Sequence, residues 1–344
     1  MTERTFEKEC ERSQEGLWQR FFDKKEKVLQ NHWPVRMSEN WIYWWHAHAL
    51  DVLLDGYVRS RDQKYMNRFQ QEIAGTFQMN GNTFLHNWYD DMEWMALALL
   101  RAYDTFREDR YRMAVLVIWE DIKTAWNDYC GGGMAWKKDQ LDYKNTPANA
   151  PAAILAFRLY QRFGNEEDLA WGERIYLWNR DNLMDPETCF IWDGMNREGD
   201  GKIDKDWKFT YCQGVVLGAA VEYYKITGRE EHLELARKIA CQAVKELAGE
   251  DRIFFSEGEG DCGLFRGIFF RYLFELVAAA PDCTELEEVI RINARAVKEA
   301  MDEDGLIGKE WHLVNRGEID LAQHLSGIMV LEMAEKLEKE RSCT

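Results

Sequence analysis

Proline, the residue that most effectively interrupts helices, is scarce in this sequence, with five residues in 344. Average usage would give roughly 17, so long uninterrupted helices are expected. No apolar run approaches the roughly 18 residues of a membrane-spanning helix, which argues against a membrane partner. Basic residues are also in deficit, at 44 against 61 acids, and the net charge of −17 argues against a nucleic-acid partner.

Cysteine pairs at metal-site or redox spacing are missing as well. The eight cysteines include no C-x-x-C motif, and several lie in apolar helical stretches, as Cys241 does. This pattern predicts reduced thiols instead of a disulfide framework. The first residues, MTERTFEKECERSQEG, carry no apolar segment of the secretory type. We therefore expect a cytoplasmic protein.

Helical periodicity is what the sequence has in abundance. Apolar residues recur at three- and four-residue spacing in about twelve segments separated by Gly, Asn or Asp clusters. The predicted helices span residues 4–30, 41–60, 62–78, 89–106, 108–128, 144–163, 165–182, 210–226, 229–247, 262–279, 284–301 and 318–339.

Connections between these segments alternate between short and long, which indicates six antiparallel helical hairpins. The even-numbered helices are apolar nearly all round, as in GVVLGAAVEYY, whereas segment 229–247 alternates with charge. Helices of the first kind are buried and those of the second kind cover them. The pattern predicts an all-α protein, an (α/α)6 barrel of six inner and six outer helices forming a single domain over residues 1–344. An open solenoid of helical pairs is the alternative, although no fixed-period repeat supports it.

Asp90 and Asp91 stand out at the start of one inner helix, where the helix dipole favours carboxylates. Adjacent carboxyl groups on a first turn can reach the roughly 5–5.5 Å separation that a retaining glycosidase uses. Asp90-x-x-Glu93 also fits a helix capping box, which needs no catalysis. Both interpretations remain open from the spacing alone.

Aromatic residues gather near the same predicted end of the molecule, where they suit stacking on sugar rings. The tryptophans concerned are Trp44, Trp45, Trp88, Trp136, Trp192, Trp207 and Trp311. The acid-rich segment 193–206 does not match the EF-hand spacing and is predicted to be a polar hairpin. No motif in the sequence points to a metal or another cofactor, and we expect none.

Several segments taken together, in order, resemble glycoside hydrolase family 76, the endo-acting α-1,6-mannanases. They are YWWHAHALD (43–51), YDDMEWMALALLRAY (89–103), GGGMAW (131–136), YKNTPANAPAAILAFRLY (143–160), TYCQGVVLGA (210–219) and GDCGLFRGIFFRYL (260–273). The resemblance implies an (α/α)6 barrel and retaining cleavage of α-mannosidic links, with Asp90 as nucleophile and Asp91 as general acid/base. Cys212 stands where the family usually has Asn.

A mannooligosaccharide is the partner that this resemblance implies. The residues expected to stack on its rings or bind its hydroxyl groups are Trp45, Trp88, Tyr143, Asn145, Asn149, Tyr211, Gln213, Asp261, Phe265 and Arg266.

Two other functions remain compatible with the sequence. Sugar epimerases also use α/α barrels but rely on histidine pairs, and His46, His86, His312 and His324 lie near the predicted mouth. A non-catalytic oligosaccharide-binding protein would need the paired aspartates only as helix caps.

Overall fold

The computed structural model describes residues 6–36 and 41–342, which form twelve α-helices and seven short strands. None of the described helices is both long enough and apolar enough to cross a membrane. The chain divides into two compact units, each described by itself below. Unit 1 comprises Met1–Thr83, Ala248–Phe274 and Cys283–Thr344, and unit 2 comprises Phe84–Leu247 and Glu275–Asp282.

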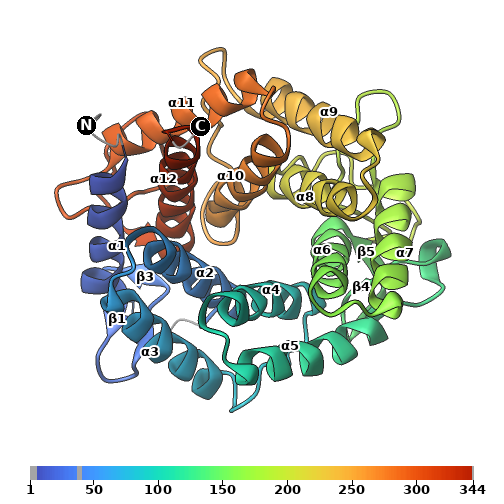
Figure 1. The fold of residues 1–344 in the computed structure, drawn as a ribbon, viewed down its shortest axis with the longest axis horizontal. Coiled ribbons are helices and arrows are strands. Elements are labelled where there is room, and N and C mark those ends of the chain that lie inside the picture. The colour runs from blue at the N-terminus through green and yellow to red at the C-terminus, as the bar shows by residue number, and fades with distance from the viewer. Residues whose placement is uncertain (1–5, 37–40, 343–344) are drawn as a thin grey trace. The chain divides into compact units, whose positions relative to one another are not determined.

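Unit 2 is a set of three helical hairpins (Figure 1). The first helices of the hairpins are α4, α6 and α8, and α6 packs against both α4 and α8; α5, α7 and α9 each cover the helix that precedes them. The packing is close where small residues allow it, since Gly172 of α7 lies against the Phe157 ring of α6. The bounds are α4 Tyr89–Phe106, α5 Asp109–Ile122, α6 Thr146–Phe163, α7 Glu166–Leu183, α8 Thr210–Thr227 and α9 Glu230–Leu247.

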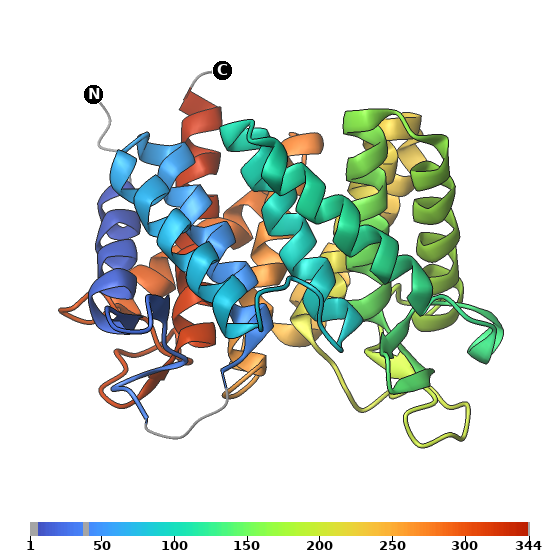
Figure 2. The same cartoon turned by 90° about the horizontal axis from the view of Figure 1, so that it is seen from below.

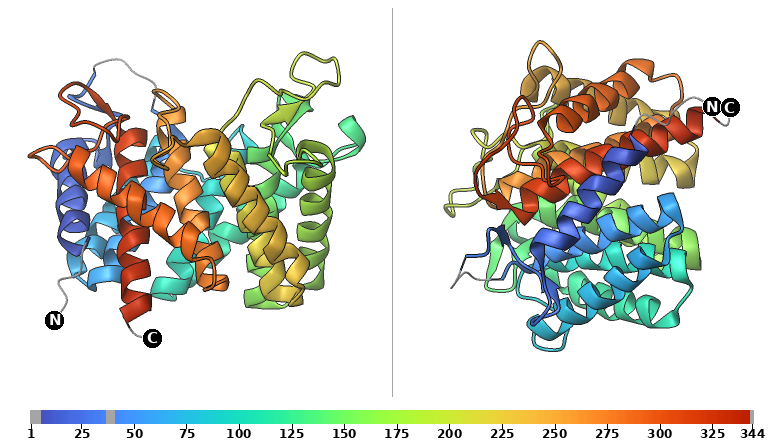
Figure 3. Two further views of the ribbon diagram at one scale, coloured as in Figure 1. Left: turned by 90° about the horizontal axis from the view of Figure 1, so that it is seen from above. Right: turned by 90° about the vertical axis from the view of Figure 1, so that its left-hand side faces the viewer.

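A small antiparallel sheet joins the starting ends of α4, α6 and α8. Its strands are β4 (Ala135–Lys137), β5 (Gln140–Asn145) and β6 (Gly194–Met195), and β5 runs directly into α6. Trp88, just before α4, forms a bridge with Lys137 of β4. The side-chain amide of Gln213 in α8 accepts a hydrogen bond from the Ile191 backbone N–H and donates one to the Ile191 carbonyl group. The three helices therefore begin at one end of unit 2, beside the sheet (Figures 2 and 3).

Unit 1 contains the remaining helices and two small hydrogen-bonded strand pairs. Helix α10 packs closely on α12, where the Gly267 backbone donates to the Ser326 hydroxyl group at 2.7 Å. A Cβ at Gly267 would lie 2.6 Å from Ser326 Cα, so this contact requires glycine. The helices are α1 Glu7–Phe21, α2 Tyr43–Ser60, α3 Gln63–Met79, α10 Cys262–Ala279, α11 Thr284–Ala300 and α12 Leu321–Ser342; the last turn of α10 belongs to unit 2. The strand pairs are β1 (Phe22–Asp23) with β2 (Val28–Leu29), and β3 (His32–Trp33) with β7 (Ile319–Asp320).

Two of the predicted helices are too long. The first ends at Phe21 instead of residue 30, because Asp23 accepts hydrogen bonds from the Lys25 and Glu26 backbones and turns the chain into a hairpin. The fifth ends at Ile122, followed by the 3-10 turns η1 (Lys123–Ala125) and η2 (Tyr129–Gly131). The predicted hairpin in segment 193–206 is confirmed by the antiparallel bridge between Met195 and Ile203.

Candidate active site

The paired aspartates lie in the first turn of α4, which the structure begins at Tyr89. The residue before it, Trp88, is extended and provides no side-chain cap. The capping-box interpretation of Asp90 and Glu93 is therefore wrong, because both residues lie inside the helix. Since the exposed N–H groups of a first turn favour negative charge, this position stabilises ionised carboxyl groups.

Asp90 is held by two donors within unit 2. Trp136 of β4 donates its indole N–H to Asp90 Oδ2 at 2.9 Å, and the Asp91 backbone donates to Asp90 Oδ1 at 3.0 Å. The Trp136 ring meets the Tyr143 ring edge-on, with centroids 5.7 Å apart. The sheet thus fixes the orientation of one carboxyl group of the pair.

Asp91 has a different neighbour, the imidazole of His86. His86 Nδ1 lies 3.0 Å from Asp91 Oδ2, and both side chains are largely but incompletely buried. The imidazole stacks on the Trp88 indole, with centroids 5.1 Å apart and planes inclined by 28°. Burial lowers the pKa of His86 below 6.5, against the opposing effect of Asp90. His86 is therefore neutral at neutral pH.

A third carboxyl group, that of Glu93, is fully buried on the same helix. Burial first, and then the charges of Asp90 and Asp91, raise the pKa of Glu93 well above 4.5. Burial and the two neighbouring charges accordingly favour the neutral form of Glu93. The three acids differ in environment even though they lie within four residues of sequence.

Four of the six predicted binding residues of unit 2 form two groups, the tyrosines and the amides. Tyr143 and Tyr211 direct their hydroxyl groups to the buried Asp193, each at 2.9 Å. Asn149 and Gln213 are fully buried and bind backbone groups. A sugar contact is compatible with neither amide unless a loop moves, so the structure assigns them to holding the loops that precede α6 and α8.

The other two predicted residues of unit 2 directly precede inner helices: Trp88 precedes α4, and Asn145 precedes α6. Trp88 is half-buried between the His86 ring and the Lys137 ammonium group, which is 5.7 Å from the ring centroid. Asn145 ends β5 and is buried. Sugar contacts for both remain predictions.

In unit 1, Asp261 orients two tryptophans. Its Oδ1 accepts the indole N–H groups of Trp44 and Trp45, each at 2.9 Å. Phe265 is buried, with its ring 6.4 Å from that of Trp44. Trp45 is itself fully buried, so its predicted role in sugar stacking is not supported.

Arg266 was also predicted to bind sugar hydroxyl groups, and the structure places it elsewhere. It is buried, donates to the carbonyl groups of Phe254 and Lys309, and stacks on the Trp311 ring at 3.7 Å. Burial lowers its pKa to about 10. Arg266 therefore holds loops of unit 1 together, and its contact with a sugar hydroxyl group stays a prediction.

The histidines required by the epimerase alternative do not form a pair. In unit 1, His46 is buried and binds Glu72 at 2.6 Å, while His324 is buried against Ser13 and Ile307. Burial lowers the pKa of His324 to about 3. His312 is exposed, 3.9 Å from Asp251. Only His86 among the four lies beside a candidate catalytic group.

A cluster around Asp193 was missed by the sequence interpretation. Arg197 pairs with Asp193 and Asp204, at 2.9 and 3.1 Å, and lies between the rings of Tyr143 and Trp207. The available signal was Asp193 itself, a single acid directly after the apolar run Phe190–Trp192. Arg197 is a local partner of Asp193, but Tyr143, Tyr211 and Cys212 lie 18 to 50 residues away, which no local pattern could reveal.

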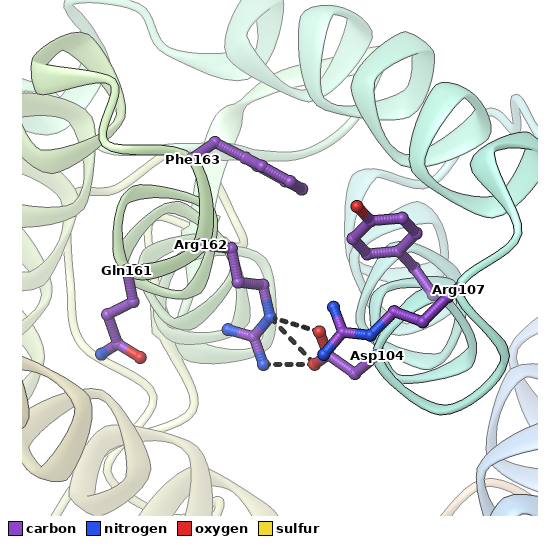
Figure 4. A pocket seen from close by; sticks show the side chains of 6 residues that line it. Asp104, Arg107, Gln161, Arg162 and Phe163 are labelled. Carbon is purple, nitrogen blue, oxygen red and sulfur yellow. Dashed lines mark hydrogen bonds and ion pairs between the residues drawn. The ribbon is translucent and has the colours of Figure 1, made fainter.

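The pocket in Figure 4 lies at the other ends of α4 and α6, away from the aspartates. It has a volume of about 500 Å³ and is lined by Tyr103, Asp104, Arg107, Gln161, Arg162 and Phe163. Arg162 is already paired with Asp104 at 2.5 Å. Among the described residues, no group of three or more His, Cys, Asp or Glu side chains could hold a metal ion.

Comparison with known proteins identifies the family. The model of glycosyl hydrolase family 76 matches residues 6–343. The chain belongs to glycoside hydrolase family 76. A mannan endo-1,6-alpha-mannosidase, DCW1 of Candida glabrata, is 23% identical over 72% of the chain, which spans 61% of that relative's length.

Solved structures extend the similarity to the whole family fold. The Lin0763 protein of Listeria innocua is 37% identical, with a TM-score of 0.92 and 97% of both chains covered. An inactive variant of the GH76A α-1,6-mannanase of Salegentibacter sp. HEL1_6, with two consecutive aspartates replaced by alanine, was solved with α-1,6-mannotetrose. It is 35% identical, with a TM-score of 0.91 over 96% of this chain and 98% of that one. The predicted fold class, an all-α (α/α)6 barrel, is confirmed by these matches. The single-domain organisation and the cytoplasmic location remain predictions.

Proposed function

We propose that this family 76 member is a retaining glycosidase that cleaves α-1,6-mannosidic links in mannan or mannooligosaccharides. The observation that carries the proposal is the pair of consecutive aspartates in the first turn of α4, each with a different polar neighbour. The Salegentibacter enzyme, an α-1,6-mannanase, is described as inactive when two consecutive aspartates are replaced, which supports the same use of the pair here.

Asp90 is the proposed nucleophile. Its carboxylate accepts hydrogen bonds from Trp136 and the Asp91 backbone, which favour the ionised form and fix its direction. It would attack the anomeric carbon and form a glycosyl ester while the bond to the leaving oxygen breaks. The helix dipole at the start of α4 stabilises the carboxylate before the attack and after its release.

Asp91 is the proposed general acid/base. It would give its proton to the leaving oxygen in the first step, and its carboxylate would then take a proton from the water that hydrolyses the ester. Two inversions at the anomeric carbon give a product with the α configuration of the substrate. No cofactor takes part in either step.

The test is product analysis on defined oligosaccharides. The wild type should cleave α-1,6-mannotetraose and leave α-1,2- and α-1,3-linked mannobiose intact, with fragments identified by mass. NMR during the first turnovers should show an α anomer. A β anomer would overturn the double displacement, and cleavage of the other linkages alone would overturn the assigned substrate.

A variant series separates catalysis from binding. The Asp90→Asn/Asp91→Asn double variant should bind mannotetraose in calorimetry without cleaving it. Asp139→Asn, which changes an exposed aspartate bound to Asn87 and Lys137, is the matched control and should keep full activity. A wild type that binds mannotetraose but never cleaves it would identify a non-catalytic sugar-binding protein instead.

A further inference from the structure

His86 is a titratable side chain in contact with the aspartate pair that the proposed mechanism does not use. It precedes α4 by three residues, and its Nδ1 lies 3.0 Å from Asp91 Oδ2. Asp90, the other member of the pair, accepts a hydrogen bond from Trp136. The two carboxyl groups are therefore supported by separate elements, the loop for Asp91 and the sheet for Asp90.

The imidazole has little freedom to leave this position. It stacks on Trp88, whose backbone forms a bridge with Lys137 of β4. The neighbouring residue Asn87 accepts a hydrogen bond from the Lys138 backbone at 3.0 Å. The two residues that follow His86 are thus attached to β4 and the residue after it, which limits the movement of the ring and keeps Nδ1 3.0 Å from Asp91 Oδ2.

The charge of the ring matters for an acid/base partner. The titratable groups around His86 are Asp90 and Asp91 on α4 and Lys138 after β4, with burial and Lys138 opposing protonation. A cationic imidazole 3.0 Å from Asp91 would favour the ionised carboxylate, so that less of the protonated form would be present to act as an acid. A neutral ring can contact Oδ2 without this effect.

We propose that His86 is a positioning residue for Asp91, holding Oδ2 so that the other carboxyl oxygen carries the catalytic proton toward the leaving group. The proposal rests on the assignment of Asp91 as general acid/base. His86 itself forms no bond to the substrate and takes no net proton in the cycle.

The test compares two substitutions at this position. His86→Phe keeps a flat ring for the Trp88 stack but removes the nitrogen, while His86→Asn places an amide nitrogen near the site of Nδ1. His312→Phe makes the same change at an exposed histidine of unit 1 and is the matched control. Each variant is assayed on α-1,6-mannotetraose and on a 2,4-dinitrophenyl α-1,6-mannobioside, whose leaving group needs no proton.

We expect His86→Phe to lower kcat/KM on mannotetraose by about 10- to 100-fold, a part of the 10²–10⁴-fold effect of general acid catalysis. On the dinitrophenyl substrate the loss should be below about threefold. His86→Asn should recover most of the activity on mannotetraose, and His312→Phe should match the wild type on both substrates. The melting temperature should stay unchanged in all three.

Two results would overturn the proposal. Equal losses on both substrates with a lower melting temperature would show that His86 only supports the fold, and no loss on either would show that it has no role. Asp91→Ala tests the underlying assignment separately. If Asp91→Ala lowered kcat/KM equally on both substrates, the assignment of Asp91 as general acid would fail, whatever His86 does.

Discussion

The start of α4 in unit 2 and the start of α10 in unit 1 both carry aspartates, but these side chains differ in what they do. Both combine acids with nearby tryptophans. At α4, Asp90 and Asp91 are half-buried; Asp90 accepts a hydrogen bond from Trp136, and Asp91 lies beside His86. At α10, Asp261 orients two indoles with one oxygen, and Arg266 is buried among carbonyl groups.

This difference separates a candidate site from a scaffold. A side chain whose hydrogen-bonding capacity is used by its own protein has little left for a substrate. Arg266 is the clearest case, because a buried guanidinium bound to two carbonyl groups would leave them unsatisfied if it moved. Acids at a helix start are thus candidates for chemistry in one unit and hold neighbouring side chains in the other.

The largest expected effect contrasts two Asp→Asn substitutions. Asp90→Asn should lower kcat/KM on mannotetraose by at least about 10³-fold, because an amide cannot attack the anomeric carbon. Asp261→Asn keeps an oxygen that accepts from both indoles, so its loss should stay below about tenfold. Steady-state kinetics with melting curves for both variants provide the measurement. Equal losses would remove the contrast between the two helices.

The next largest expected effect is that of Glu93→Gln on the free energy of unfolding. Its pKa is raised in the folded protein, so its contribution to stability is complete below pH 4.5 and is lost as pH rises toward the folded pKa. Each pH unit above 4.5 therefore costs about 1.4 kcal/mol until that pKa is reached. Glu93→Gln removes this cost.

Urea unfolding across pH 4–8 tests this prediction. Glu93→Gln and the wild type should have the same free energy of unfolding near pH 4, and the variant should be more stable by up to about 3 kcal/mol at pH 7. Glu303→Gln, at an exposed glutamate, should show no such growth with pH. A difference independent of pH would mean that Glu93 is ionised in the folded protein.

Arg266→Met should cost about 2 kcal/mol of unfolding free energy, since the carbonyl groups of Phe254 and Lys309 lose their buried donor. The apolar replacement fits beside Trp311 and offsets part of the loss. KM for mannotetraose should remain within about twofold, because the guanidinium is already occupied. A large rise in KM with unchanged stability would instead return Arg266 to the substrate-binding set.

Patterns within single segments of the sequence were enough to predict most of the helices. The predicted spans 89–106 and 262–279 match α4 and α10 residue for residue, because helical periodicity and loop composition act within one segment. The strands of unit 2 were missed, since β6 has two residues and pairs with a strand about 50 positions away. The hairpin after Phe21 was missed because the charged residues of its turn fit a helical pattern equally well. The turn forms because Asp23 accepts hydrogen bonds from the Lys25 and Glu26 backbones.

The site was predictable only in part, for a related reason. The adjacency of Asp90 and Asp91 is visible in the sequence, and their position in a first turn follows from the helix boundary. Their partners are not visible, because Trp136 reaches Asp90 from a strand 46 residues away. Whether a polar residue binds substrate or its own backbone depends on such distant contacts, and this is why Gln213 and Arg266 were assigned to the substrate.

Substitution of Cys212 is expected to give the smallest change in the free energy of unfolding. It also extends the comparison to Asp193, a structural acid in the same unit as Asp90. Its Sγ lies 3.6 Å from Asp193 Oδ1, where Tyr143, Tyr211 and Arg197 also bind the same carboxyl group. Cys212→Ala should therefore cost only about 1 kcal/mol of unfolding free energy, because a weak donor is lost while strong ones remain.

Cys212→Ser keeps a donor and should lose less than Cys212→Ala, with kcat/KM unchanged in both, as urea unfolding and steady-state kinetics would show. A loss of activity with intact stability would place this carboxyl group among the substrate contacts. The expected result has a wider meaning, since Asp193 lies in the same unit as Asp90. Whether an acid is structural or available to substrate would then depend on how many hydrogen-bond donors it already has, and not on the unit to which it belongs.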